Sequence, residues 1–208
     1  MAKRPLWYLM LGTVMLGLAV SPAFADDDDS NGDGNSQGSS DGAAAKNDVC
    51  MASSGELGKL LRYGGLVVSG WYPVGLYCEL QALAQRVLQH GSELARRIGY
   101  LNLKRDLSGP YRVLVFFLTP EAIVSGTPRM MQHYWRGGKV RVTEARDGMA
   151  AAHFSGWHGF DRNVWLDVIG AAEAAVEAAG GENVRTRVVS GGRDGDHALE
   201  LELRWTRR

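Results

Sequence analysis

Aromatic and histidine side chains cluster in two segments of this chain, and these residue types commonly line pockets for small molecules. The segment GWYPVGLYCEL carries Trp71, Tyr72 and Tyr77, and the segment MMQHYWR carries His133 and Tyr134. Such pockets combine apolar and aromatic walls with a few polar groups that orient the ligand. We predict that these five residues line an apolar pocket in which a tyrosine hydroxyl is the orienting group. The alternative for Trp71 and Tyr72 is that they only attach the start of a helix to the core.

Residue types used in metal binding and catalysis are present, but not at the spacing that such sites need. His153 and His158 are five residues apart in an expected strand, which places them on opposite faces, and no further ligand lies beside them. Ser155 lacks the preceding glycine of the hydrolase nucleophile elbow. We therefore expect no metal site and no catalytic residues, and an enzyme stays the less favoured alternative.

Helical patterns must position both pocket segments. Pro73 suits the first turn of a helix that ends near Gly91, and apolar residues recur between them at helical spacing. Ser92 can cap a second helix. Two Thr-Pro pairs, at 119–120 and 127–128, begin two more helices, and the second of these carries His133 and Tyr134. The segment GPYRVLVFFLT between them fits either a strand or a buried helix.

The second half of the chain predicts two β-hairpins with one helix between them. KVRVTEA and MAAAHFSGW flank the turn Arg146-Asp147-Gly148, and NVRTRVV and ALELELRW flank SGGRDGDH. The helix runs from an N-cap at Asp161 to the glycine pair at 180–181. The resulting order is an N-terminal helical half followed by β-β-α-β-β with an antiparallel sheet. The fold class is therefore α+β.

The N-terminus has the pattern of an exported protein. Residues 1–25 combine Lys3 and Arg4, an apolar stretch and the small-residue site Ala23-Phe24-Ala25, which together predict a cleaved signal peptide. Residues 26–48 are rich in Asp, Ser, Gly and Asn, a composition that predicts a disordered spacer. Residues 49–208 are then a single domain. We expect a periplasmic or secreted protein with no membrane span after cleavage.

Export gives the two cysteines a predicted role. The chain contains two of them, Cys50 just after the spacer and Cys78 in the first predicted helix. Beyond the cytosol an even number of cysteines favours a disulfide, and we predict a Cys50–Cys78 bond. The alternative is that Cys78 fills the core and Cys50 is a free thiol.

The charge pattern excludes one class of partner. Lysine and arginine together number 23, aspartate and glutamate together number 23, and the formal net charge is zero. The basic residues are scattered, with no basic stripe studded with aromatic residues, so we expect no nucleic-acid partner.

Several segments together resemble an uncharacterised paralogous domain family of myxobacteria. They are GWYPVGLYCEL, LARRIGYLNLKRDL, the helix pair around TPEAIVSGTPRMMQHYWRGG, and the ending from GAAEAAVEAAGG to LELELRW. This ending is also similar to the superfamily of vinyl-reductase-type, haem-nitric-oxide-binding and transport-particle domains. Members of that superfamily hold a small or lipid-like apolar ligand between helices and a sheet, so the resemblance implies ligand binding.

The resemblance is also the basis for an expectation about haem. The haem-binding branch uses a proximal histidine followed by Tyr-x-Ser-x-Arg, whereas the nearest string here, from Tyr100 to Lys104, has other polar residues. We therefore expect no cofactor, with haem disfavoured. The leading hypothesis is an exported, non-catalytic binding or sensing module for a small apolar ligand. The alternatives are an interaction module that forms a homodimer through the helical half, and a hydrolase-like or cyclase-like enzyme.

Overall fold

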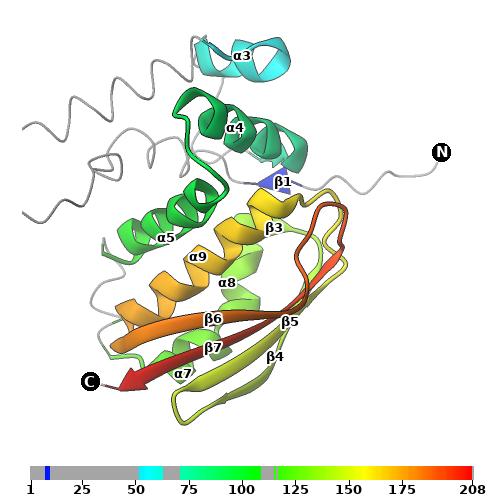
Figure 1. Ribbon diagram of the computed structural model, residues 1–208. Coiled ribbons are helices and arrows are strands. Elements are labelled where there is room, and N and C mark those ends of the chain that lie inside the picture. The colour runs from blue at the N-terminus through cyan, green and yellow to red at the C-terminus, as the bar shows by residue number, and fades with distance from the viewer. Residues whose placement is uncertain (1–7, 10–51, 63–70, 109–114, 116, 208) are drawn as a thin grey trace, which may run out of the picture.

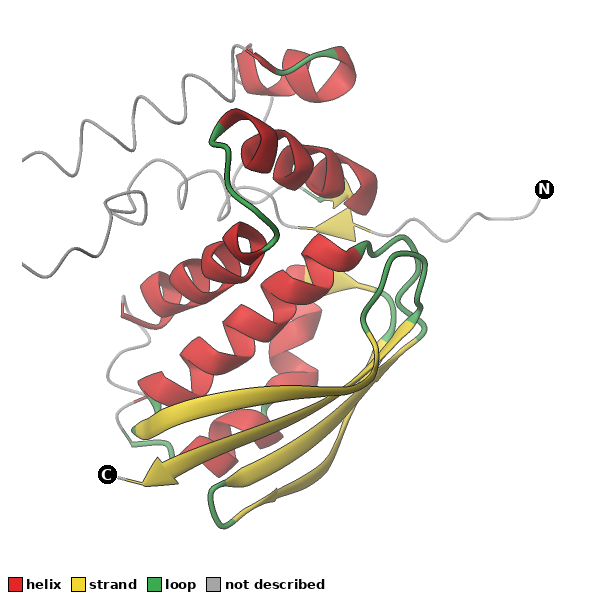
Figure 2. Ribbon diagram, in the orientation of Figure 1, coloured by secondary structure: helices red, strands yellow, loops and turns green. Residues whose placement is uncertain are grey.

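Helices precede and cover a four-stranded antiparallel sheet (Figures 1 and 2). The structure is a computed structural model that describes residues 8–9, 52–62, 71–108, 115 and 117–207. Its helices are α3 (Gly55–Arg62), α4 (Val74–Val87), α5 (Glu93–Ser108), α7 (Pro120–Ser125), α8 (Thr127–Tyr134) and α9 (Arg162–Ala178). The predicted α+β fold is confirmed.

The sheet consists of two hairpins joined through their second strands. Its order is β4-β5-β7-β6, and its strands are β4 (Lys139–Arg146), β5 (Met149–Ser155), β6 (Gly181–Gly191) and β7 (Ala198–Arg207). The first hairpin turns at Asp147 and Gly148, whose φ angles of 50° and 76° suit a two-residue turn with two left-handed residues. Helix α9 connects the hairpins and packs against β6 and β7, while α7 and α8 pack against β4. Both predicted hairpins are confirmed.

The side chains of β7 follow the predicted alternation. Leu199, Leu201 and Leu203 are buried on the helix-covered face, where they meet α9 and the rest of the core. On the other face, Arg187 of β6 is opposite Glu202 and donates to it over 2.7 Å. This exposed pair contributes little to stability, because water and salt screen it.

A second, short sheet joins distant parts of the chain. Strand β1 (Tyr8–Leu9) lies between β2 (Tyr72–Pro73) and β3 (Trp135–Arg136), with both pairings antiparallel. Tyr8 and Leu9 belong to the predicted signal peptide. The remainder of that peptide and the whole predicted spacer at 26–48 lie outside the described residues, so both assignments stay predictions.

The helix starts follow from local hydrogen bonding. Asp161 caps α9, because its carboxylate accepts a hydrogen bond from the backbone N–H of Val164 over 2.9 Å. Thr119 caps α7 by accepting from the N–H of Ala122 over 3.2 Å, with Pro120 in the first turn. Pro73 is the residue immediately before α4. The predicted starts of these three helices are confirmed.

Helices α5 and α9 cross at unusually close range through two glycines. A Cβ atom on Gly99 would lie 2.0 Å from the backbone oxygen of Asp167, and one on Gly170 would lie 1.9 Å from the backbone oxygen of Arg96. No side chain fits at either position, so the two backbones touch there. This contact fixes α9, and Asp167 with it, against α5.

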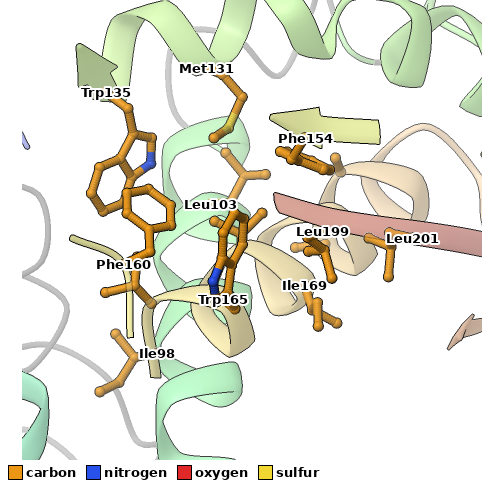
Figure 3. Close-up of a cluster of buried hydrophobic side chains, with 14 of the residues drawn as sticks. Ile98, Leu103, Met131, Trp135, Phe154, Phe160, Trp165, Ile169, Leu199 and Leu201 are labelled. Atoms are coloured by element: carbon orange, nitrogen blue, oxygen red, sulfur yellow. The ribbon is translucent and has the colours of Figure 1, made fainter. Parts of the chain in front are cut away.

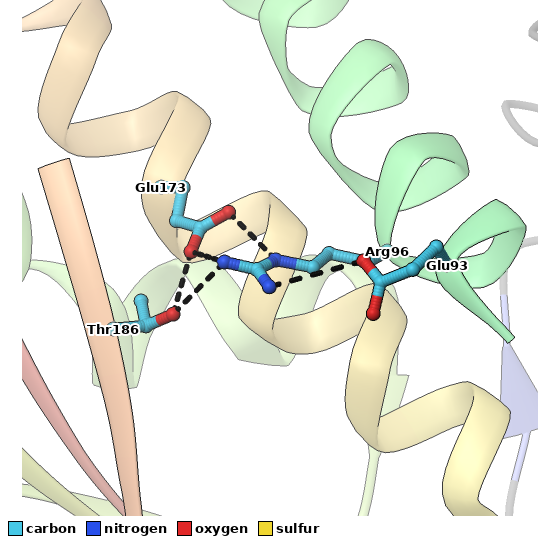
Figure 4. Close-up of polar contacts among 4 residues, drawn as sticks. All are labelled: Glu93, Arg96, Glu173 and Thr186. Atoms are coloured by element: carbon cyan, nitrogen blue, oxygen red, sulfur yellow. Dashed lines mark hydrogen bonds and ion pairs between the residues drawn. The ribbon is translucent and has the colours of Figure 1, made fainter.

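A polar network supports the same crossing from the side (Figure 4). Arg96 of α5 binds the carboxylate of Glu173 on α9 through two nitrogens, and its Nε lies 3.0 Å from Glu173 Oε2. The hydroxyl of Thr186 on β6 donates to Glu173 over 2.6 Å. Two helices and one strand are thereby joined, in a geometry that a bidentate Arg–carboxylate pair makes specific.

The core beneath α9 is rich in aromatic rings (Figure 3). The ring centroid of Phe160 lies 4.7 Å from that of Trp135 and 4.8 Å from that of Trp165. Phe154 meets Trp165 edge-on at 6.3 Å. Tilted and edge-on contacts of this kind add stability beyond the buried area, typically about 1 kcal/mol each. Of these rings, Trp135 and Phe154 also line the space described next.

Candidate ligand-binding cavity

A cavity of about 90 Å³ lies between helices α5, α8 and α9 and the inner face of the sheet. Helix α5 contributes Gly99, Asn102, Leu103 and Asp106, whose spacing places them on one face of the helix. Helix α9 contributes three alanines, at positions 171, 172 and 175. Because alanine fills little volume, these positions leave the space open.

Aromatic and apolar side chains complete the wall. Phe154 and Leu201 of the sheet close one side, and Met131, Tyr134 and Trp135 close another. Leu201 is 1% exposed and Phe154 2% exposed, so this side of the cavity is solidly packed. The cavity is mostly apolar with a small number of polar groups, which is the composition of a small-molecule site.

A tyrosine–carboxyl pair supplies two of the polar groups of the cavity. Tyr77 of α4 is 1% exposed, and its hydroxyl donates to Asp167 Oδ1 over 2.7 Å. Burial raises the pKa of Asp167 to about 7, against the opposing effect of the hydrogen bond from Tyr77. Burial, followed by the nearby Asp167, raises the pKa of Tyr77 well above its usual value. Tyr77 therefore stays protonated and remains the donor.

A second carboxylate lies at the same cavity on α5. Tyr134 donates to Asp106 Oδ2 over 3.0 Å, and Arg105 Nη2 lies 3.7 Å from Asp106 Oδ1. Burial raises the pKa of Asp106, while Tyr134 and Arg105 lower it to a smaller extent. Asp106 thus has a cationic neighbour, whereas no ion-pair partner of Asp167 is found in the described part of the chain.

Asn102 adds an unused hydrogen-bond acceptor to the lining. The residue is 9% exposed, and its Oδ1 has no hydrogen-bond partner among the described residues. A buried acceptor without a donor is destabilising by roughly 1–3 kcal/mol. The cavity therefore offers a place where a ligand donor would be favourable.

The five predicted pocket residues divide into two groups. Tyr77 and Tyr134 line the cavity and each holds a carboxylate. Trp71 instead packs under the guanidinium of Arg136, with Cζ 4.2 Å from the ring centroid. Tyr72 pairs within the short sheet, and His133 is exposed on α8. These last three are not among the described residues that line the cavity.

Sequence reasoning missed the carboxylates and Asn102, although α9 carried a usable signal. Asp167 lies three residues after Val164 and four before Ala171, which places a charged residue inside the apolar stripe of the helix. A charge in such a stripe needs either a partner or a function. The same argument applies to Asn102 and Asp106, which share a helix face with Leu103.

Of the two cysteines in the predicted disulfide, the structure describes Cys78. Cys78 is half-buried, and its sulfur lies 3.6 Å from the backbone oxygen of Gly159. Burial and, to a lesser degree, the nearby Asp161 raise the pKa of the Cys78 thiol to about 12. Cys50 lies outside the described residues, so the Cys50–Cys78 bond stays a prediction.

Neither a metal cluster nor a membrane span is found in the described ranges. Among those residues, no group of three or more His, Cys, Asp and Glu side chains could hold a metal ion. None of the described helices is long and apolar enough to cross a bilayer.

Comparison with known proteins identifies the fold. No protein-family model matches the chain, and no curated protein matches it. The crystal structure of an unliganded Fe(II) H-NOX protein from K. algicida has a TM-score of 0.63 and 9% identity, covering 95% of this chain and 97% of that chain. The solution structure of the IWP-051-bound H-NOX from Shewanella woodyi, in the Fe(II)CO state, has a TM-score of 0.62 and 14% identity, covering 95% of each chain.

A third solved structure names the cofactor of such domains. It is described as modulating haem redox potential through protein-induced porphyrin distortion, and has a TM-score of 0.51 and 11% identity, covering 67% of this chain and 79% of that chain. At these identities the likeness shows the fold alone. It confirms the predicted similarity to the haem-nitric-oxide-binding superfamily at that level, while the likeness to a myxobacterial family and to the other superfamily branches stays a prediction.

The expectation of no cofactor, with haem disfavoured, is wrong in light of these neighbours. It rested on one short string, Tyr100 to Lys104, whereas the neighbours with this fold are haem-binding domains. A fold is specified by the volume and pattern of its core, which many sequences satisfy, so a departure in five residues does not exclude the ligand of the fold.

Proposed function

We propose that this chain, which has the fold of H-NOX domains, is a small-ligand-binding or sensing domain. The observation that carries the proposal is the apolar cavity between α5, α8, α9 and the sheet, with the hydrogen-bonded Tyr77–Asp167 pair in its lining. The fold supports it, since solved structures with this fold include domains that bind haem and gases.

The lining residues have different roles in binding a ligand. The alanines of α9 leave the space, and the aromatic side chains exclude water from it. Tyr77 holds Asp167 in one orientation by donating to it over 2.7 Å. A ligand that fills the space contacts α5 and α9 together, so it can alter how tightly these helices pack. This is how the domain would report binding.

Filling the cavity tests this proposal. Ala171→Leu places a larger side chain in the space, whereas Ala178→Leu makes the same change at an exposed position of α9. Xenon enters apolar cavities, so its NMR shift should respond to the wild-type chain and to Ala178→Leu, but not to Ala171→Leu. Native mass spectrometry of the purified protein should also show a retained ligand. Absence of any xenon response from the wild type would contradict the proposal.

Haem is a second candidate ligand, favoured by the fold. The lining residues of types known to ligate haem iron are Tyr77, Met130, Met131 and Tyr134; none of the described lining residues is a histidine or a cysteine. Bound haem would supply an iron that can bind a gas. A cavity of about 90 Å³ is below the roughly 300 Å³ of pockets for drug-sized ligands, so the cavity would have to widen for haem to enter.

Titration with haemin distinguishes haem from a smaller ligand. Haem binding predicts a Soret band that saturates at one haem per chain and is weakened by Ala171→Leu but not by Ala178→Leu. A band that is equal in all three proteins would indicate adsorption outside the cavity and would remove this candidate.

We also propose that the domain acts after export. The signal-peptide pattern of residues 1–25 supports this proposal, and the intact mass of the protein recovered from the periplasm tests it.

A further inference from the structure

The polar groups of the cavity are mainly hydrogen-bond acceptors. Asp106, Asp167 and Asn102 are lining residues, and Asn102 Oδ1 has no hydrogen-bond partner among the described residues. The hydroxyl protons of Tyr77 and Tyr134 are already donated to the two carboxylates, over 2.7 and 3.0 Å. A ligand that brings donors would satisfy this arrangement better than one that brings acceptors.

Asn102 supplies an observation independent of the carboxylates. Its side chain is more than nine-tenths buried, lines the cavity, and has an Oδ1 without a partner among the described residues. Buried polar atoms in folded proteins are nearly always hydrogen-bonded, so an unsatisfied one in a cavity indicates an absent donor.

The charge of the lining points to the same kind of ligand. Arg105 forms an ion pair with Asp106. Within the described residues, the partner of Asp167 is the neutral hydroxyl of Tyr77. Arg96, on α5 at the α5–α9 crossing, is held by Glu173 and Thr186. An ionised Asp167 therefore lacks a cation among the described residues, and a cation nearby would stabilise this partly buried carboxylate.

The walls and the volume set the size of the ligand. The rings of Tyr77, Tyr134, Trp135 and Phe154 surround the space and can attract a cation through their faces. A cavity of about 150 Å³ accommodates benzene, with six non-hydrogen atoms. In proportion, this cavity of about 90 Å³ accommodates a ligand of about four non-hydrogen atoms.

We infer that the ligand is a small aliphatic amine bound as its ammonium ion, with the nitrogen donating to Asp167 and Asn102 and the hydrocarbon part against the α9 alanines. This inference rests on the proposed function and names the ligand class of the same cavity. Asp106, which already has Arg105, completes the polar side of the site.

Three probes of equal length test the inference: n-propylamine, 1-propanol and propionate. Each is titrated into the full chain at about pH 8 and followed by the backbone amide shifts of the residues around the cavity. We expect the amine to bind at least about tenfold more tightly than 1-propanol, and propionate not to bind. Below about pH 7 the amine affinity should fall, because protonation of Asp167 removes the charge that holds the ammonium group.

Substitutions test whether the amine binds at Asp167. Asp167→Asn keeps an acceptor for Tyr77 but removes the charge, and should weaken amine binding about 10- to 100-fold while leaving 1-propanol unchanged. Glu177→Gln makes the same change at an exposed position of α9 and should bind the amine like the wild type. Ala171→Leu should lose both the amine and the alcohol.

The contrary outcomes separate the two proposals. If 1-propanol binds as tightly as the amine, or if Asp167→Asn binds the amine like the wild type, the amine assignment is wrong and the cavity remains a binding site. If none of the probes binds and xenon also gives no response, both the amine assignment and the proposed function are wrong.

Discussion

At the scale of single residues, Asp167 is the group whose environment is most unusual. It lies in the wall of an apolar cavity, and its described hydrogen-bond partner is the Tyr77 hydroxyl. Its pKa is about 7 in the folded chain, against roughly 3.9 for an unperturbed aspartate. The folded state therefore binds this proton more tightly than the unfolded state does, and ionising Asp167 opposes folding.

The sign of this effect gives a prediction for Asp167→Asn. As pH rises from about 4 to 7, the wild type should lose stability at Asp167, while the asparagine variant cannot. The variant should thus be more stable at about pH 8, by on the order of 2 kcal/mol after allowing for the part of Asp167 that meets solvent, and the difference should vanish near pH 4. Urea denaturation of both proteins across this range measures it.

A companion variant checks the cause. Tyr77→Phe removes the hydrogen bond that lowers the pKa of Asp167, so the loss of stability should begin near the same pH as in the wild type, extend to a higher pH and be larger. A stability difference between wild type and Asp167→Asn that is constant from pH 4 to about pH 8 would show that Asp167 does not titrate there.

At the scale of elements, the α5–α9 crossing determines the geometry of the cavity. Gly99 and Gly170 let the two backbones touch, while on either side Asn102, Asp106 and the α9 alanines face the space. Close contact at one point and small side chains next to it leave a gap that the sheet and α8 do not fill. The cavity is a consequence of how these two helices meet.

Alanine substitutions at this crossing should therefore destabilise the fold. Alanine is the better helix former by about 1 kcal/mol, but a Cβ at Gly99 or Gly170 would overlap a backbone oxygen at 2.0 or 1.9 Å. We expect Gly99→Ala and Gly170→Ala each to lower the free energy of unfolding by about 1–3 kcal/mol. Gly75→Ala, in α4 with no atom near its Cβ, is the matched control and should be neutral or stabilising. Circular dichroism during urea denaturation decides; equal stability of all three variants would contradict the close contact.

The elements themselves were predictable from sequence, whereas their crossing was not. The alternation in β7 and the Asp161 cap of α9 are local patterns, and the structure confirms both. Which helices touch depends on residues distant in the sequence, and nothing in the residues around Gly99 indicates that it meets α9. The same limit explains the site: Tyr77 and Tyr134 were found as aromatic residues, but their partners Asp167 and Asp106 come from other helices.

At the scale of the whole molecule, the N-terminus connects fold, location and cysteine chemistry. Strand β1, at Tyr8–Leu9, lies between β2 and β3 in the short sheet. Removal of residues 1–25 on export would remove this strand and leave β2 and β3 without their common neighbour. A mature chain should therefore keep the four-stranded sheet and the cavity, since none of the described lining residues comes from the first 25.

Export is also the condition for the predicted Cys50–Cys78 bond, and one experiment tests both. Intact mass of the protein expressed with its N-terminus and recovered from the periplasm should correspond to a chain that begins at Asp26 and carries a disulfide. The raised pKa of Cys78, about 12, means that its thiolate is scarce, so the bond should form slowly without an oxidase.

Closing this loop should stabilise the fold by about 3 kcal/mol, less any strain, and Cys50→Ser should lose that amount without altering xenon binding. Alkylation of two thiols in the periplasmic protein without reductant, whether native or denatured, would rule out the disulfide, and an uncleaved mass would rule out the signal peptide.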